Sequence, residues 1–155
     1  MRDKLKAKGT VHFFMYDEKG TVKLDRTQPN LVVDTGLNWI IDRMLDTGTL
    51  MSHMSIGTGT VTPVAGNTTL GTPTPGEVRR AYDSATDNGD STITWQATFP
   101  TDVGNTNGWS AAITEAGLFN AGAAGVMLAR TTFSEINKGD NDTLVITWTI
   151  DLNAA

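Results

Sequence analysis

Few residues of this chain have the types and the spacing that catalysis or metal binding requires. The sequence contains no cysteine, which excludes disulfides, thiolate metal sites and cysteine nucleophiles. The two histidines, His12 and His53, each fall in an expected strand, and neither has an acidic or histidine partner at the spacing of a metal site. We therefore expect a structural or surface role for both.

Two short motifs resemble ligand-binding loops but lack parts that such loops need. Residues 57–60 read Gly-Thr-Gly-Thr, without the lysine of a phosphate-binding loop and without a helical pattern after them. Residues 140–142 read Asp-Asn-Asp, without the alternating ligands and distal glutamate of an EF-hand loop. We favour a glycine-rich turn at the first motif and a polar turn, rather than bound calcium, at the second. No cofactor and no metal site is expected.

One carboxylate lies in an otherwise apolar strand pattern. Glu115 lies within residues 113–119, where its side chain must face water or find a partner. Arg130 has a comparable place in residues 126–132, which we expect to pair with the first segment across a turn. We predict a cross-strand ion pair between Glu115 and Arg130 with a structural role. Catalysis by Glu115 is disfavoured, because no second carboxylate is placed to act with it.

The elements that would position these groups are mainly strands. Apolar and polar residues alternate most clearly at 91–99 and at 144–152, as in half-buried strands. Pro29 is expected to interrupt the pattern after an opening hairpin. In total we expect about seven or eight strands in an antiparallel β-sandwich. The other expected strands are residues 10–16, 21–25, 53–56, 110–119 and 126–133.

One segment has the periodicity of a helix. Apolar residues recur on one stripe of residues 37–46, after a possible cap at Asp34 or Thr35, and Gly48 is suited to end the helix. A lone amphipathic helix must bury its stripe on a sheet, so we expect it to close one face or end of the β domain. The stripe consists of Leu37, Ile40, Ile41, Met44 and Leu45.

Size and charge limit the classes of function. The 155 residues suit a single domain, with 39% hydrophobic and 19% charged residues as in a folded protein. The net charge of -5 argues against a nucleic-acid partner, because such binding depends on basic residues that neutralise phosphates. No stretch is apolar enough for a membrane span, and the charged start does not resemble a secretory signal. We expect synthesis in the cytoplasm and no contact with a membrane.

Two regions are candidates for contacts with other proteins. Residues 1–9 form a basic arm ahead of a single β domain at 10–155; a solvated tail is the favoured interpretation, and contact with an acidic neighbouring subunit is the alternative. Residues 61–77 form a long surface loop rich in Gly, Thr and Pro, which could cross a neighbouring protein. The candidate interaction residues are Arg2, Lys4, Lys6, Lys8, Thr62, Pro63, Val64, Leu70, Pro73 and Pro75.

Five segments, in this order along the chain, resemble a group of small virion proteins of tailed bacteriophages, described as head-decoration, tail-fibre-like or baseplate proteins. The resemblance spans roughly residues 30–150 and is most specific at 115–133. It implies a place in a virus particle assembled in the bacterial host, and it carries over no catalytic residues. The segments are residues 30–38, 52–60, 114–120, 125–133 and 142–150.

Three functions follow as hypotheses. The first is a capsid decoration (cement) protein that binds the major capsid protein and stabilises the head shell. The second is a tail component, such as a baseplate or fibre-attachment subunit that contacts a receptor or another tail protein. The third is an enzyme acting on polysaccharide, which would need paired carboxylates or a metal cluster. We expect a non-enzymatic protein that forms a homo-oligomer, with a trimer favoured.

Overall fold

The computed structural model describes residues 5–75 and 78–154, in which nine strands and one helix are present. The strands are β1 (Leu5–Tyr16), β2 (Val22–Val32), β3 (His53–Gly57), β4 (Arg80–Ala81), β5 (Ser84–Asp87), β6 (Thr92–Phe99), β7 (Ala111–Phe119), β8 (Met127–Lys138) and β9 (Thr143–Ala154), and the helix is α1 (Asp34–Met44). All strand pairs are antiparallel, and together they form one sheet in the order β4-β3-β7-β8-β2-β1-β9-β6-β5.

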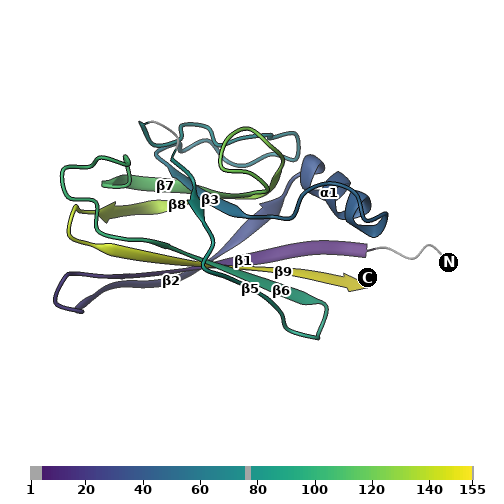
Figure 1. The fold of residues 1–155 in the computed structure, drawn as a ribbon, viewed down its shortest axis with the longest axis horizontal. Coiled ribbons are helices and arrows are strands. Elements are labelled where there is room, and N and C mark those ends of the chain that lie inside the picture. Colours follow the sequence, from purple (N-terminus) through teal and green to yellow (C-terminus); the bar gives the residue numbers. More distant parts are fainter. Residues whose placement is uncertain (1–4, 76–77, 155) are drawn as a thin grey trace.

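The sheet curls so that its two halves face each other, with β3, β7 and β8 above β1, β9 and β6 in Figure 1. The inward side chains of both halves make one core, because every second residue of a strand points to the same face. Trp148 and Phe13 are among its members from the lower half, and Ile113 and Leu118 come from the upper half. The alternation seen in the sequence therefore marks the concave face of the sheet.

The expected mainly β, antiparallel fold is confirmed, whereas the sandwich of seven or eight strands is not. The described residues contain nine strands, and β2 joins the two halves into one continuous sheet. β2 pairs with β1 along most of its length, from Val22 to Asn30, and then with β8 through Leu31 and Val32. A single strand thus belongs to both halves, which the period of its side chains does not reveal.

Pro29 does not interrupt the second strand, contrary to expectation. It lies within β2 opposite Thr10 of β1. Proline has no N–H, so it is tolerated in a strand at a position where the neighbouring strand needs no backbone donor from it. The neighbouring strand here is β8. Its Thr131 hydroxyl, and not its backbone, bonds to β2 at this point, donating to the Pro29 carbonyl at 2.8 Å. The backbone ladder between β2 and β8 resumes only at Leu31.

The first strand begins at Leu5, earlier than the expected start at Thr10. Residues 5–9 pair with the other end of the chain, since Leu5 lies opposite Ala154 and Gly9 opposite Ile150. The described part of the predicted arm is therefore strand rather than a tail, because β9 is long enough to pair with it. Lys6 and Lys8 lie exposed on this strand, and Arg2 and Lys4 lie outside the described residues.

The helix forms where expected but is seated differently. It begins at Asp34 after the N-cap residue Val33, which makes no side-chain cap, so neither Asp34 nor Thr35 is the cap residue. The Thr35 hydroxyl instead donates to the Met127 carbonyl of β8 at 2.9 Å. Gly36 packs so tightly on the Leu128 backbone that a side chain there would overlap the Leu128 carbonyl. This contact determines which face of α1 meets the sheet.

The edges of the sheet are short strands that the sequence did not reveal. β4 and β5 lie at opposite ends of the sheet and have two and four residues. β5 is exposed along its whole length, so it has no buried face to create an alternating pattern.

Among the described residues, no helix has the length and apolar character needed to cross a membrane.

Candidate functional site

The predicted ion pair between Glu115 and Arg130 is present and buried. The Arg130 Nε and Nη2 atoms donate to Glu115 Oε2 at 3.0 and 2.7 Å, and both side chains are almost completely inaccessible. In the β7–β8 register Glu115 lies opposite Thr132, and Arg130 opposite Gly117, so the pair is diagonal. Two bonds from one guanidinium give this pair a defined geometry as well as charge neutralisation.

The Glu115 carboxylate also receives three backbone N–H groups. Gly59 and Thr72 donate to Oε1 at 3.1 and 2.6 Å, and Gly71 donates to Oε2 at 2.9 Å. A Cβ at Gly59 would overlap Glu115 Oε1, and one at Gly57 would lie 2.7 Å from the same atom. The glycines of residues 57–60 are therefore required for close approach to the protein's own carboxylate. Gly57 ends β3 and residues 58–60 follow it without a regular turn, and the backbone of this segment binds Glu115.

Arg130 extends the same network into the predicted surface loop. Its Nη1 donates to Asn67 Oδ1 at 2.9 Å, and its Nη2 donates to the Val61 carbonyl at 3.1 Å. The Asn67 side chain in turn accepts a bond from the Val64 N–H at 2.9 Å. The described part of the loop is thus held on its own domain by one buried ion pair.

The candidate interaction residues of the loop have different surroundings. Leu70 is buried with Val33, Phe119 and Met127, so it is not available for a partner, and this part of the expectation is wrong. The reason is local: Gly71 and Thr72 are held on Glu115, which places Leu70 against the sheet. Of the remaining loop candidates, Thr62, Val64 and Pro75 are exposed, and Pro63 and Pro73 are partly buried.

Helix α1 has an exposed apolar face, contrary to the expectation that its apolar stripe is buried. Its predicted stripe was expected on the sheet, yet only Ile40 of that stripe packs against the core. Trp39 packs beside Ile40 against the core. Gly36, one turn earlier in the helix, lies against the Leu128 backbone. The rest of the stripe faces outward: Leu37 is 43% exposed, Ile41 57%, Met44 77% and Leu45 73%, and nearby Leu50 is 61% exposed. We call these five residues the α1 face.

The Asp-Asn-Asp turn lies beside a set of buried charges. Asp142 accepts bonds from Lys23 Nζ at 2.6 Å and from the Gly139 N–H at 2.8 Å. Burial opposes ionisation of Asp142, but these bonds and the nearby lysines outweigh it and lower its pKa. The pKa of Lys138 is lowered by burial, against the attraction of Asp102, Asp142 and Asp140. In the part of the chain that the structure describes, no three acidic or histidine groups are arranged to hold a metal.

Asp102 is the most heavily hydrogen-bonded carboxylate of this end of the domain. It accepts bonds from the Trp109 N–H at 3.1 Å, from the Asn107 N–H and side-chain amide at 3.2 and 3.0 Å, and from the Thr106 hydroxyl at 3.1 Å. Burial alone would raise the pKa of Asp102, but the four donors together hold it below its usual value. Its role is to close the 102–109 loop.

The histidines have partners that sequence spacing could not show. His12 Nε2 lies 2.7 Å from Asp25 Oδ1, a residue that the β1–β2 hairpin places diagonally across from it. His53 Nδ1 lies 2.8 Å from the Ser52 hydroxyl oxygen. Burial and the nearby Arg79 cation lower the pKa of His53. The His12–Asp25 pair is exposed on the outer side of the sheet, away from the buried network around Glu115.

Two kinds of site therefore emerge from the geometry. One is an internally satisfied network that holds the loop, and the other is an apolar helix face whose five side chains are each between 43% and 77% exposed. Comparisons of the sequence with models of protein families and with curated proteins find no match.

Proposed function

We propose that this protein is a structural component of a tailed-bacteriophage particle, which binds neighbouring virion proteins through the α1 face. The observation that carries the proposal is the exposure of Leu37, Ile41, Met44 and Leu45 on a helix that packs on the core through Trp39 and Ile40. Contiguous apolar surface on a soluble domain is typical of a site for another protein.

Hydrogen bonds hold the α1 face in place before a partner binds. Binding therefore does not have to supply the free energy of ordering a flexible surface. The Trp39 indole N–H donates to the Thr49 carbonyl at 2.7 Å, and Arg43 Nη1 donates to the Thr47 and Gly48 carbonyls at 3.1 and 3.0 Å. These bonds hold the segment after the helix, which contains Leu50. An amphipathic helix that presents apolar residues at this spacing fits a groove on a partner.

Within the particle we favour a capsid decoration role, with the major capsid protein as partner. The resemblance of residues 30–150 to small virion proteins supports this class. A decoration protein that binds only the assembled shell would stabilise it by mass action. Self-association, with a trimer favoured, would present several α1 faces to the lattice at once.

Copy number in purified particles tests this assignment. Particles made by the phage genome that encodes the chain should contain it at a number comparable to that of the capsid subunits. A few copies per particle would favour the tail role, as a baseplate or fibre-attachment subunit. Its absence from the particles would overturn the proposal.

Variants of the helix test the surface itself. Ile41→Ser and Met44→Ser should lower incorporation into particles by about tenfold, as expected for apolar contacts at the centre of an interface. Asn38→Ser, which changes an exposed polar residue of the same helix, is the matched control and should be incorporated normally. Normal incorporation of both apolar variants would show that α1 is not the docking surface.

A further inference from the structure

The outer face of the sheet carries a row of aromatic side chains on β1. His12, Phe14 and Tyr16 alternate with the buried residues Phe13 and Met15, so all three point away from the core. The ring centroids of His12 and Phe14 are 6.4 Å apart, and those of Phe14 and Tyr16 are 6.0 Å apart. The rings therefore form a continuous row along one strand.

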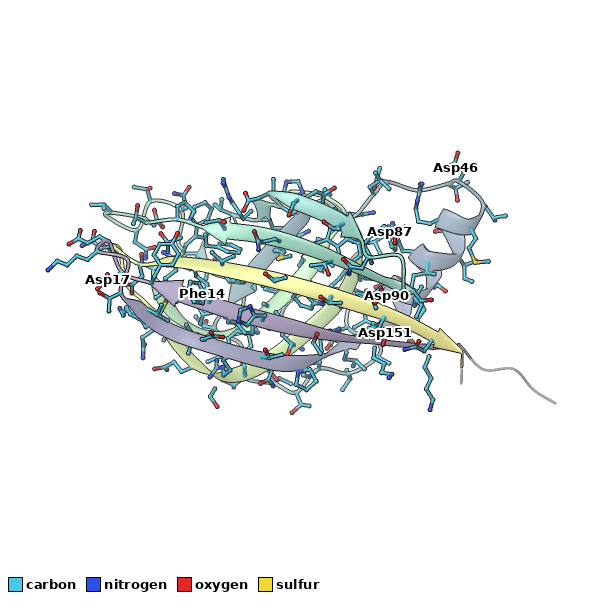
Figure 2. The ribbon with its side chains drawn as sticks, turned by 90° about the horizontal axis from the view of Figure 1, so that it is seen from below. Phe14, Asp17, Asp46, Asp87, Asp90 and Asp151 are labelled. Atoms are coloured by element: carbon cyan, nitrogen blue, oxygen red, sulfur yellow. The ribbon has the colours of Figure 1, made fainter. Side chains whose placement is uncertain are left out.

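Nothing in the described chain covers this face. Figure 2 shows β2, β1, β9 and β6 side by side from below, with Phe14 on the outside of β1. The helix and the loop that binds Glu115 lie on the other side of the sheet in Figure 1. Partly exposed aromatic rings on an open sheet face cost hydration free energy that a bound ligand would recover.

The row leads into a depression at the other end of the same strand. This depression has a volume of about 410 Å³ and lies beside Gly9, between Lys8 and Thr10. Thr10 and Thr149 lie directly opposite each other on its margin, and so do Lys8 and Asp151. The remaining lining residues are Pro29, Asn30 and Thr92.

The groups beside the row offer directed hydrogen bonds. Thr147 lies opposite His12, and Asp25 lies opposite Phe14 on the other side. Bonds to neighbours hold two of these groups in place, since Gln96 Nε2 donates to the Thr147 hydroxyl at 3.2 Å and Asp25 holds the His12 ring. The face thus combines flat apolar surfaces with fixed donors and acceptors.

We propose that this face, from Lys8 to Tyr16 of β1 with the adjoining Thr147, Thr149 and Asp151 of β9, binds an uncharged oligosaccharide. A sugar ring has an apolar face of C–H groups, which packs on an aromatic ring, and a rim of hydroxyls, which need both donors and acceptors. The eight residue steps from Lys8 to Tyr16 span about 27 Å of strand, enough for a chain of several sugars.

Charge favours a neutral glycan over a polyanion. Asp87, Asp90 and Asp151 lie at the end of the sheet where the depression is found (Figure 2). These carboxylates would repel uronate or phosphate groups, and Lys8 is already opposite Asp151. The aromatic row on β1 and the α1 face are different surfaces, so glycan binding and virion docking can be tested separately.

Affinity electrophoresis of the purified protein tests the proposal. Gels would contain dextran, pullulan, hydroxyethylcellulose or arabinoxylan as neutral probes, and alginate as the polyanionic probe. We expect at least one neutral polysaccharide to retard the protein and alginate to have no effect. Retardation by none of the neutral probes, or by alginate alone, would overturn the proposal.

Variants of Phe14 separate ring stacking from general apolar contact. Phe14→Leu and Tyr16→Ala should weaken retardation by about tenfold, whereas Phe14→Tyr should retain it. Ile41→Ser on the α1 face is the control and should bind polysaccharide normally. If Phe14→Leu instead prevents incorporation into particles while no polysaccharide binds, the face is a protein interface and the glycan proposal is wrong. Thermal unfolding checks that each variant is folded.

Discussion

At the scale of single residues, Glu115 shows how a buried charge can organise a segment distant in sequence. Its carboxylate accepts bonds from Arg130 and from three backbone N–H groups of residues 59–72. The donors come from three separate places, namely Gly59, the adjacent pair Gly71 and Thr72, and Arg130 of β8, so the charge is satisfied only when all three have assembled. Such a network favours one arrangement of the loop over others, since a partial set leaves a buried charge without donors.

Replacing this carboxylate should therefore be costly. Glu115→Gln leaves the Arg130 cation buried without its counter-ion, and we expect the free energy of unfolding to fall by about 3–5 kcal/mol. Urea unfolding measures the loss, with Glu135→Gln on the exposed side of β8 as control. The double variant Glu115→Leu with Arg130→Met should be less destabilised than Glu115→Gln. A loss below about 1 kcal/mol for Glu115→Gln would contradict a structural role for the pair.

Asp102 should make stability depend on pH in acid. Its folded pKa lies below the usual 3.8, so its ionised form stabilises the protein above about pH 4 and this contribution disappears as the pH falls through the folded pKa. In Asp102→Asn, the free energy of unfolding should be lower near neutral pH and should fall less steeply below pH 4. Denaturant unfolding at a series of pH values measures the slopes.

At the scale of elements, α1 depends on one close backbone contact. Gly36 lies against the backbone of Leu128, and this contact turns Trp39 and Ile40 towards the sheet and the α1 face towards solvent. An apolar gap of about 150 Å³ remains in the seam between the helix and the sheet, lined by Trp39 and Ile40 on one side and by Ile93 and Leu128 on the other. The orientation of the helix is thus determined by the smallest residue in it.

Gly36→Ala should displace the helix. Alanine is favoured over glycine in a helix by about 1 kcal/mol, yet here its methyl group would overlap the Leu128 carbonyl. We expect Gly36→Ala to destabilise the protein by about 1–3 kcal/mol, as overpacking typically does, whereas Asn38→Ala at an exposed position of α1 should be neutral or stabilising. Thermal unfolding compares the two. A stabilised Gly36→Ala would show that the helix is not held by this contact.

The sequence predicts those elements whose side chains divide between core and solvent. β6 and β9 were identified because their inward residues, such as Trp95 and Trp148, alternate with threonines. β5 was missed because all of its residues are exposed. The Glu115–Arg130 pair was predictable, since a charge inside an apolar strand needs a partner. The N–H groups from Gly59, Gly71 and Thr72 were not predictable, because they meet the carboxylate only through the folded path of the loop.

At the scale of the whole molecule, the first and last strands of the described chain pair with each other inside the sheet. β1 lies between β2 and β9, and it pairs with β9 from Leu5 to Tyr16. The basic segment that the sequence suggested as an arm therefore continues a central strand, and Gly9 is where β1, β2 and β9 come together, opposite Asn30 and Ile150. Charge alone could not distinguish an arm from the exposed side of a strand.

Deleting residues 5–9 should consequently affect folding and not only binding. The deletion removes backbone pairing with the last part of β9 and exposes the edge of that strand. We expect a loss of unfolding free energy of about 2 kcal/mol or more, since several ladder bonds of about 0.5–1.5 kcal/mol each are lost. The double substitution Lys6→Gln with Lys8→Gln keeps the strand and removes only charge, so it should change stability by less than about 0.5 kcal/mol. Equal stability of the deletion variant and the native chain would mean that these residues behave as a tail.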